Sequence, residues 1–206
     1  MNRKDLKEFL DQKVIEYNRP EFVATDPIQI VHQFSKKQDI EIIGLLVATI
    51  AWGNRTSIIK NGQRIVEIME NSPHDFLMNT DEKDWQHIQF VHRTYNVDDL
   101  LFFMKALKEI YTKTESLESL FLPTENLNGV KSRIHHFRTE FLSYPHLKRS
   151  EKHISDPMSG SAAKRLNMYL RWMVRNDNNG IDFQNPKRLR DLSSRCFLIE
   201  LELMAQ

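Results

Sequence analysis

The sequence predicts an all-α protein built from many short helices. Apolar residues recur at spacings of three and four over most of the chain, which is the pattern of helices with one buried face. Strand-like alternation is absent, and the chain has only six glycines for tight turns. Capping residues and prolines also stand where these periodic segments begin. The expected fold class is therefore all-α, in one compact domain or in one domain with appended helices.

The first half of the chain predicts a buried central helix between shorter ones. An amphipathic helix is expected to open the chain over residues 6–17 and to end before Pro20. Asp26 caps a short helix that extends to Phe34. Residues 40–52 are apolar almost all round, so this helix should lie in the core.

The second half continues the helical pattern after a polar break at Gly53. The remaining predicted segments cover residues 58–69, 73–78, 98–111, 125–141 and 160–174.

Composition excludes several classes of protein. No run of apolar residues is long enough to span a membrane, and the first residues lack the apolar core of a signal peptide. Cys196 is the single cysteine, so neither an internal disulfide nor a cysteine-ligated cluster can form. We expect a cytoplasmic protein with no membrane partner.

Positive charge is concentrated in one block. Residues 131–175 carry ten Lys and Arg against three Asp and Glu, a net charge of +7, whereas residues 1–130 carry a net charge of −5. Such an excess is typical of a surface that binds a polyanion. A solvated helix surface has the same composition, and charge alone does not separate the two.

The histidines in this block do not predict a metal site. His135 and His136 are adjacent and point to different helix faces, and His146 and His153 flank a Lys/Arg-rich loop that repels cations. We expect no metal and no cofactor, and we expect these histidines to extend the basic surface.

Lys164 is the candidate with the most specific surroundings. Gly160 and Ser161 form a turn and a cap before it, in the pattern G-x-x-x-K-x-x-N-x-x-L. A lysine beside free N–H groups at the start of a helix can bind phosphate, and apolar neighbours can convert an amine into a nucleophile. The alternative is an ordinary solvated lysine.

The break after the central helix is a second candidate. A polar turn on a rigid helix can present Asn54 or Arg55 to a ligand, or it can simply connect two helices around Trp52.

Residues 92–96, His-Arg-Thr-Tyr-Asn, form a third candidate. Arg93 and its aromatic neighbours suit a nucleotide-binding cleft, and packing of a loop is the alternative.

Two resemblances follow from these residues. Gly160, Lys164, Asn167 and Leu170 match the core of the hairpin and following helix in the helix-hairpin-helix DNA glycosylases of the endonuclease III type. The runs at 51–55, 92–96 and 155–157 resemble an uncharacterised conserved bacterial family, itself similar to those glycosylases, over residues 1–183.

The glycosylase resemblance implies a helix-hairpin-helix fold that binds duplex DNA. Lys164 would be the nucleophile that attacks the sugar C1′ during removal of a damaged or mismatched base. The expected DNA contacts are Asn54, Arg55, Arg93, Lys148, Arg149, Lys152, His153, Gly160, Ser161, Arg165 and Asn167. A non-catalytic helical nucleic-acid-binding module and a helical interaction protein are the alternatives.

The chain departs from the glycosylase pattern in the hairpin and at its end. Ser159 and Ala162 replace a usual proline and glycine, and residues 184–206 form an atypical tail without the Asp-x-His segment of the glycosylases. We therefore expect a domain over residues 1–183, a truncated or frame-shifted end, and weak or absent activity, because the catalytic aspartate is missing.

Overall fold

A computed structural model describes residues 2–122 and 129–175. Its α-helices are α1 (Arg3–Tyr17), α2 (Pro20–Val23), α3 (Ile28–Val31), α4 (Lys37–Ile50), α5 (Arg55–Ile68), α6 (Pro73–Asn79), α7 (Val97–Lys113), α8 (Gly129–Phe141) and α9 (Lys164–Val174). Short 3-10 turns lie at η1 (Asp84–His87), η2 (Leu117–Phe121), η3 (Lys148–His153) and η4 (Pro157–Ser159). The predicted helical class is confirmed in these residues.

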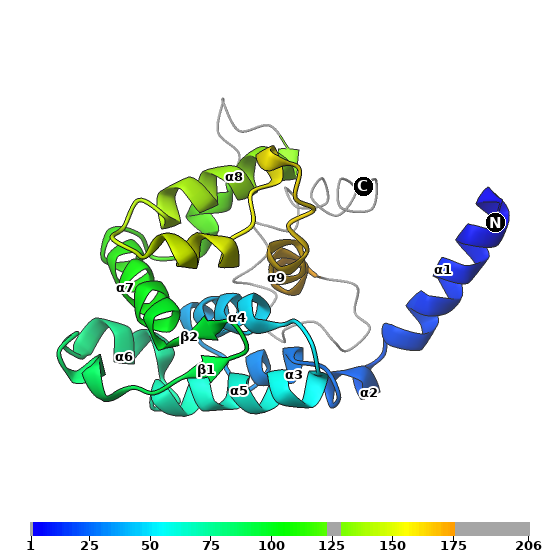
Figure 1. The fold of residues 1–206 in the computed structure, drawn as a ribbon. Coiled ribbons are helices and arrows are strands. Elements are labelled where there is room, and N and C mark those ends of the chain that lie inside the picture. The colour runs from blue at the N-terminus through cyan, green and yellow to red at the C-terminus, as the bar shows by residue number, and fades with distance from the viewer. Residues whose placement is uncertain (1, 123–128, 176–206) are drawn as a thin grey trace.

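Helix α4 is the core of the molecule. Its residues from Asp39 to Ile50 are all buried, and it packs against α3, α5, α6 and α9. Figure 1 shows α4 between α5 on one side and α9 on the other. The predicted central helix over residues 40–52 is therefore confirmed, because a helix that is apolar all round needs neighbours on every side.

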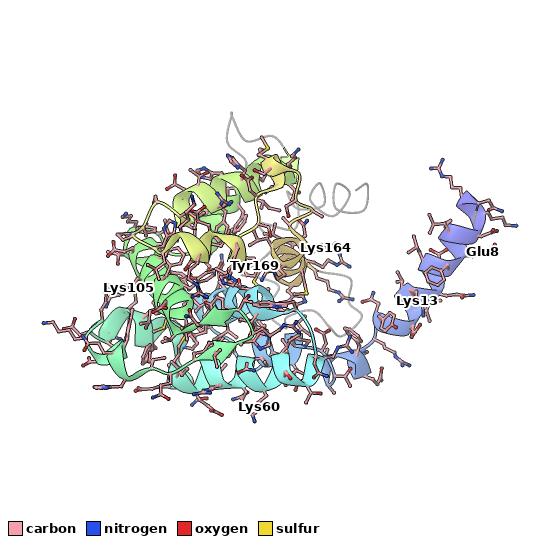
Figure 2. The ribbon with its side chains drawn as sticks, viewed as in Figure 1. Glu8, Lys13, Lys60, Lys105, Lys164 and Tyr169 are labelled. Carbon is pink, nitrogen blue, oxygen red and sulfur yellow. The ribbon has the colours of Figure 1, made fainter. Side chains whose placement is uncertain are left out.

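Gly44 allows α9 to approach α4 closely. A Cβ atom at this position would lie 2.8 Å from Met173 Cε and 3.3 Å from Tyr169 Cε2. Tyr169 points inward from α9 (Figure 2) and is 2% exposed. The contact holds the second half of α9 against the middle of α4.

Two buried acids on α4 connect it to the loops around it. Glu41 accepts hydrogen bonds from the Tyr111 hydroxyl at 2.7 Å, the Ser116 hydroxyl at 2.5 Å and the Leu117 N–H at 2.9 Å. Asp39 accepts from the His74 N–H at 2.8 Å, at the start of α6. Burial raises the pKa of both carboxyl groups.

Helix α1 differs from the amphipathic packing that the sequence suggested. Its Asn2 cap and its bounds agree with a helix that ends before Pro20, but none of its residues is buried. Leu6, Phe9, Leu10 and Val14 are each more than two-fifths exposed. Figure 1 shows α1 projecting from the remainder of the molecule.

A two-stranded hairpin stands where the sequence suggested a loop. Strands β1 (Val91–His92) and β2 (Tyr95–Asn96) pair antiparallel, with His92 opposite Tyr95. Each strand has only two residues, which is too short for an alternating pattern to be seen in the sequence. Within the described residues, no helix is long and apolar enough to cross a membrane. The predicted domain boundary at residue 183 and the tail lie outside the described residues.

Candidate nucleic-acid interface

Trp52 joins four segments that are far apart in the sequence. It follows the end of α4, and its ring meets the His92 ring of β1 edge-on, with centroids 5.1 Å apart. The His153 ring of η3 is stacked on it at 6.0 Å, and the Arg165 guanidinium of α9 lies 5.0 Å from the ring centroid. The three candidate regions of the sequence therefore meet around one indole ring.

Arg165 is a half-buried cation held by neutral groups. Its guanidinium donates to the Thr49 carbonyl at 2.5 Å and to the Lys152 carbonyl at 3.3 Å. Burial lowers its pKa, yet arginine remains charged at neutral pH. No acidic side chain in residues 2–122 and 129–175 forms an ion pair with it, so its charge is available to an anion.

Asp99 connects η3 to the hairpin and the start of α7. The carboxylate is fully buried and accepts hydrogen bonds from the Ser150 hydroxyl at 2.6 Å and the Asn96 N–H at 2.9 Å. Arg149 Nη1 lies 3.0 Å from the Asp99 carboxylate, and the guanidinium also donates to the Thr94 carbonyl at 2.9 Å. Arg149, which we expected to contact DNA, thus neutralises Asp99 and joins η3 to the hairpin.

His153 does not extend the basic surface, contrary to expectation. The residue is 4% exposed, with its Nε2 atom 3.3 Å from Asp99. Burial lowers its pKa to about 4. The positive charge of Arg165 lowers this pKa further, and the negative charge of Asp99 opposes the shift. The imidazole is therefore neutral at pH 7 and serves as a support for Trp52.

A pocket of about 240 Å³ opens between the start of α5 and β1. It is lined by Asn54, Ser57, Asn61, Val91, His92 and Arg93, and no acidic residue lines it. The structure thus brings the second and third sequence candidates to one cavity.

The floor of this pocket is fixed by hydrogen bonds. Asn61 Nδ2 donates to the Ser57 carbonyl at 2.9 Å and lies 3.1 Å from His92 Nδ1, which therefore accepts the hydrogen bond. Burial lowers the pKa of His92, and the Trp52 and Ile50 carbonyls that face its ring partly offset this effect. A neutral His92 adds no charge to the pocket at pH 7.

Arg93 and Gly53 are both held in the left-handed backbone region. Arg93 has φ = 56° at the first turn position of the hairpin, and Gly53 has φ = 98°. A Cβ atom on Gly53 would overlap the Arg93 guanidinium. Another residue at position 53 would have a strained backbone, and its Cβ atom would move the Arg93 guanidinium aside.

The other two residues of this loop have clear local contacts. The Asn54 side chain caps α5 by accepting from the Ser57 N–H at 3.1 Å. The Arg55 guanidinium lies 5.5 Å from the centre of the Phe22 ring. Arg55 is exposed, so it can still reach an anion.

The turn before α9 is held by hydrogen bonds, because the Gly160 and Ser161 N–H groups donate to the Pro157 and Asp156 carbonyls. Gly160 has φ = 84°, and a Cβ atom there would meet open space. Ser161 Oγ accepts from the Ala163 N–H at 3.1 Å, and Asn167 Nδ2 donates to the Ala162 carbonyl at 2.8 Å. Asn167 therefore supports the turn, and the helix begins at Lys164 rather than at Gly160. No side chain caps its first turn.

Lys164 is exposed and points away from the core (Figure 2). It does not line the pocket at Asn54 and Arg93. The apolar surroundings that the sequence suggested for this amine are not seen, because Leu166 and Ala163 turn inward while Lys164 faces solvent. Its neighbour Arg165 places it beside the Trp52 cluster.

Exposed lysines complete this surface. Lys148 and Lys152 are exposed on η3, and neither forms an ion pair with a described residue. We define the basic surface as Arg93, Lys148, Lys152, Lys164 and Arg165. His135, in contrast, contacts Asp156 at 2.9 Å and is not part of it. In residues 2–122 and 129–175, no group of three or more metal-ligating side chains is present.

The sequence did not predict that Asp99 and Trp52 lie at the centre of the site. The signal for Asp99 was local: Asn96 and Asp99 form a reciprocal cap at the start of α7, an N-x-x-D pattern that can be read in the sequence. The stack on Trp52 has no such signal, because its partners lie 40 to more than 100 residues away.

The fold and the site define a mostly helical protein with a basic surface built around a buried aromatic and histidine cluster. Residues 26–190 match the model of a protein family of unknown function, DUF2400, and because the match covers most of the chain, the protein belongs to this family. This confirms that the chain belongs to an uncharacterised family. No curated protein and no solved structure shows a significant match.

Proposed function

We propose that this protein binds duplex DNA through the basic surface, and that it is a glycosylase-like protein in which base-removal chemistry is weak or absent. The observation that carries the proposal is the half-buried Arg165, whose charge is held by two carbonyls and an indole ring instead of a carboxylate. An uncompensated guanidinium at a surface is well suited to a phosphate.

The groups around Arg165 support the same ligand. Lys164 and Lys152 flank it, and the uncapped first turn of α9 adds N–H groups that favour anions. Gly160 leaves open space beside that turn, so a sugar–phosphate strand can approach the backbone. Phosphate contacts of this kind give affinity without reading sequence.

The position of Lys164 favours a binding role over a nucleophilic one. A nucleophilic lysine needs a desolvated site or a second cation that favours the neutral amine. Lys164 is exposed and projects outward (Figure 2). In this protein the lysine of the G-x-x-x-K pattern would contact phosphate.

The test is the salt dependence of binding to a labelled duplex, measured by fluorescence anisotropy. The double variant Lys152→Ala/Lys164→Ala removes two phosphate contacts and should flatten the slope of log K against log salt by about 2. Lys60→Ala is the matched control, since Lys60 is also exposed but points away from α9 (Figure 2). An unchanged slope in the double variant would refute DNA binding at this surface.

Borohydride trapping on a duplex with an abasic site tests the chemistry separately. We expect no trapped adduct. An adduct that forms with the natural chain and disappears in Lys164→Ala would establish Lys164 as a nucleophile and overturn the binding-only role.

A further inference from the structure

We infer that the pocket between α5 and β1 binds a phosphate monoester through Arg93. That this phosphate is the 5′ end of a DNA strand rests on the proposed function, whereas binding of phosphate itself does not. Of the residues of the basic surface, Arg93 lines this cavity, whereas Lys148, Lys152, Lys164 and Arg165 do not.

The lining residues define the chemistry of the ligand. Arg93 is the one charged residue of the lining, and Ser57, Asn54 and Asn61 add neutral polar groups. Without a carboxylate, the pocket is unsuited to a cation or an amine. A small group with several acceptor oxygens fits both the charge and the donors.

Arg93 is free to bind an anion. In the described residues, its side chain has no ion pair, and it is exposed. Its backbone is held at φ = 56°, a conformation that costs a bulky residue about 1 kcal/mol or more and that tends to be kept at functional sites.

The Arg93 side chain lies against Gly53, the residue before the lining residue Asn54. Gly53 at φ = 98° leaves room for the guanidinium, and a Cβ atom there would displace it. Ser57 Oγ has no hydrogen-bond partner in the described residues, while the Ser57 N–H is already capped by Asn54. Ser57 and Arg93, which carry a donor hydroxyl and a donor guanidinium, thus both line one small cavity.

The size of the cavity favours a terminal phosphate over a bridging one. A volume of about 240 Å³ admits a phosphoryl group and part of a sugar but not a duplex. A phosphate monoester presents three terminal oxygens and up to two negative charges, so an arginine fork discriminates it from a diester.

The experiment uses the full chain with two probes. Inorganic phosphate is titrated while the imidazole resonances of His92 are followed by NMR, and duplexes with 5′-phosphate and 5′-hydroxyl ends are compared by anisotropy. We expect His92 to shift with phosphate, and we expect the 5′-phosphate duplex to bind about tenfold tighter. Arg93→Asn should abolish both effects, since asparagine tolerates the left-handed backbone.

Lys60→Ala is the control and should leave both effects unchanged, because Lys60 is on α5 but does not line the pocket. A phosphate-dependent shift with equal affinity for both duplex ends would support a free small phosphate as the ligand. Absence of any shift, together with equal duplex affinities, would overturn the inference while leaving the salt-dependent binding of the proposed function intact. Ser57→Ala provides a second variant, which should weaken phosphate binding several-fold without disturbing the hairpin.

Discussion

The guanidinium of Arg165 lies over the indole ring of Trp52, with 5.0 Å between Cζ and the ring centroid. The contact joins the start of α9 to the end of α4, and His153 supports the same ring through a stacked contact. A cation on an aromatic face is stabilised by the ring quadrupole, more strongly when it is desolvated.

Replacing Trp52 should therefore destabilise the fold as well as the surface. Trp52→Leu leaves space between His153 and Arg165 and should lower the free energy of unfolding by about 2–3 kcal/mol. Urea denaturation followed by circular dichroism measures this change. Trp52→Phe keeps an aromatic face and should lose less than half as much; equal losses would show that the ring stack contributes nothing.

Asp99 and Asp98 provide a matched pair for the buried carboxylate. Asp99→Asn leaves Arg149 without its closest negative partner, and this should cost about 2–4 kcal/mol of stability. Asp98 is exposed and lies 4.0 Å from Arg149, so Asp98→Asn should cost less than about 1 kcal/mol. Chemical denaturation of both variants gives the comparison, and similar losses would contradict the role of Asp99.

The buried His153 predicts a pH dependence below neutrality. Its native pKa of about 4 lies below the value of about 6.5 for an unfolded histidine, so the unfolded chain takes up a proton that the native protein does not. Stability should be unaffected by His153 above pH 6.5 and should fall between pH 6.5 and pH 4, by up to about 3 kcal/mol.

The measurement is the stability of the natural chain minus that of His153→Gln at each pH. The subtraction is needed because burial also raises the pKa of Glu41 and Asp39, so these carboxyl groups contribute their own dependence of stability on pH. Glutamine does not titrate, so the difference should decline as pH is lowered. A constant difference from pH 8 to pH 4 would mean that the pKa of His153 is the same in the native and unfolded states, which would contradict its burial as a neutral group.

Alanine variants at Gly53 and Gly160 separate the effect of backbone strain from the effect of displacing the Arg93 side chain. Both have positive φ, but a Cβ atom on Gly53 meets Arg93, whereas one on Gly160 meets nothing within 4 Å. Gly160→Ala should cost about 1 kcal/mol from conformation alone. Gly53→Ala should cost a similar amount, because the end of the exposed Arg93 side chain can move aside, but it should also abolish the NMR response of His92 to phosphate, because Arg93 is displaced.

The sequence was sufficient for much of the helical framework and insufficient for the site. The continuous apolar run at 40–52 and the spacing at 98–111 predicted α4 and α7 to within three residues at each end, because burial is recorded in local periodicity. Local periodicity did not indicate which helices pack against the core. Helix α1 has an apolar stripe similar to those of packed helices, yet it buries none of its residues.

The candidate segments were also visible, but their relationship was not. Trp52, Arg93 and Arg165 each belonged to a segment that stood out by composition, and no local pattern tells which segments meet. His153 was also misinterpreted for this reason. A histidine among lysines suggested a charged surface, but His153 is buried against Trp52 and Asp99 and is neutral.

Helix α1 is stabilised by little beyond its own backbone and local side-chain pairs. Its surface ion pairs, such as Lys7–Asp11, are exposed and add only tenths of a kcal/mol, and an isolated fifteen-residue helix is marginal in water. Its amide hydrogens should therefore exchange with deuterium several orders of magnitude faster than those of α4, and a protease should cleave the chain before Pro20 while residues 28–68 remain intact.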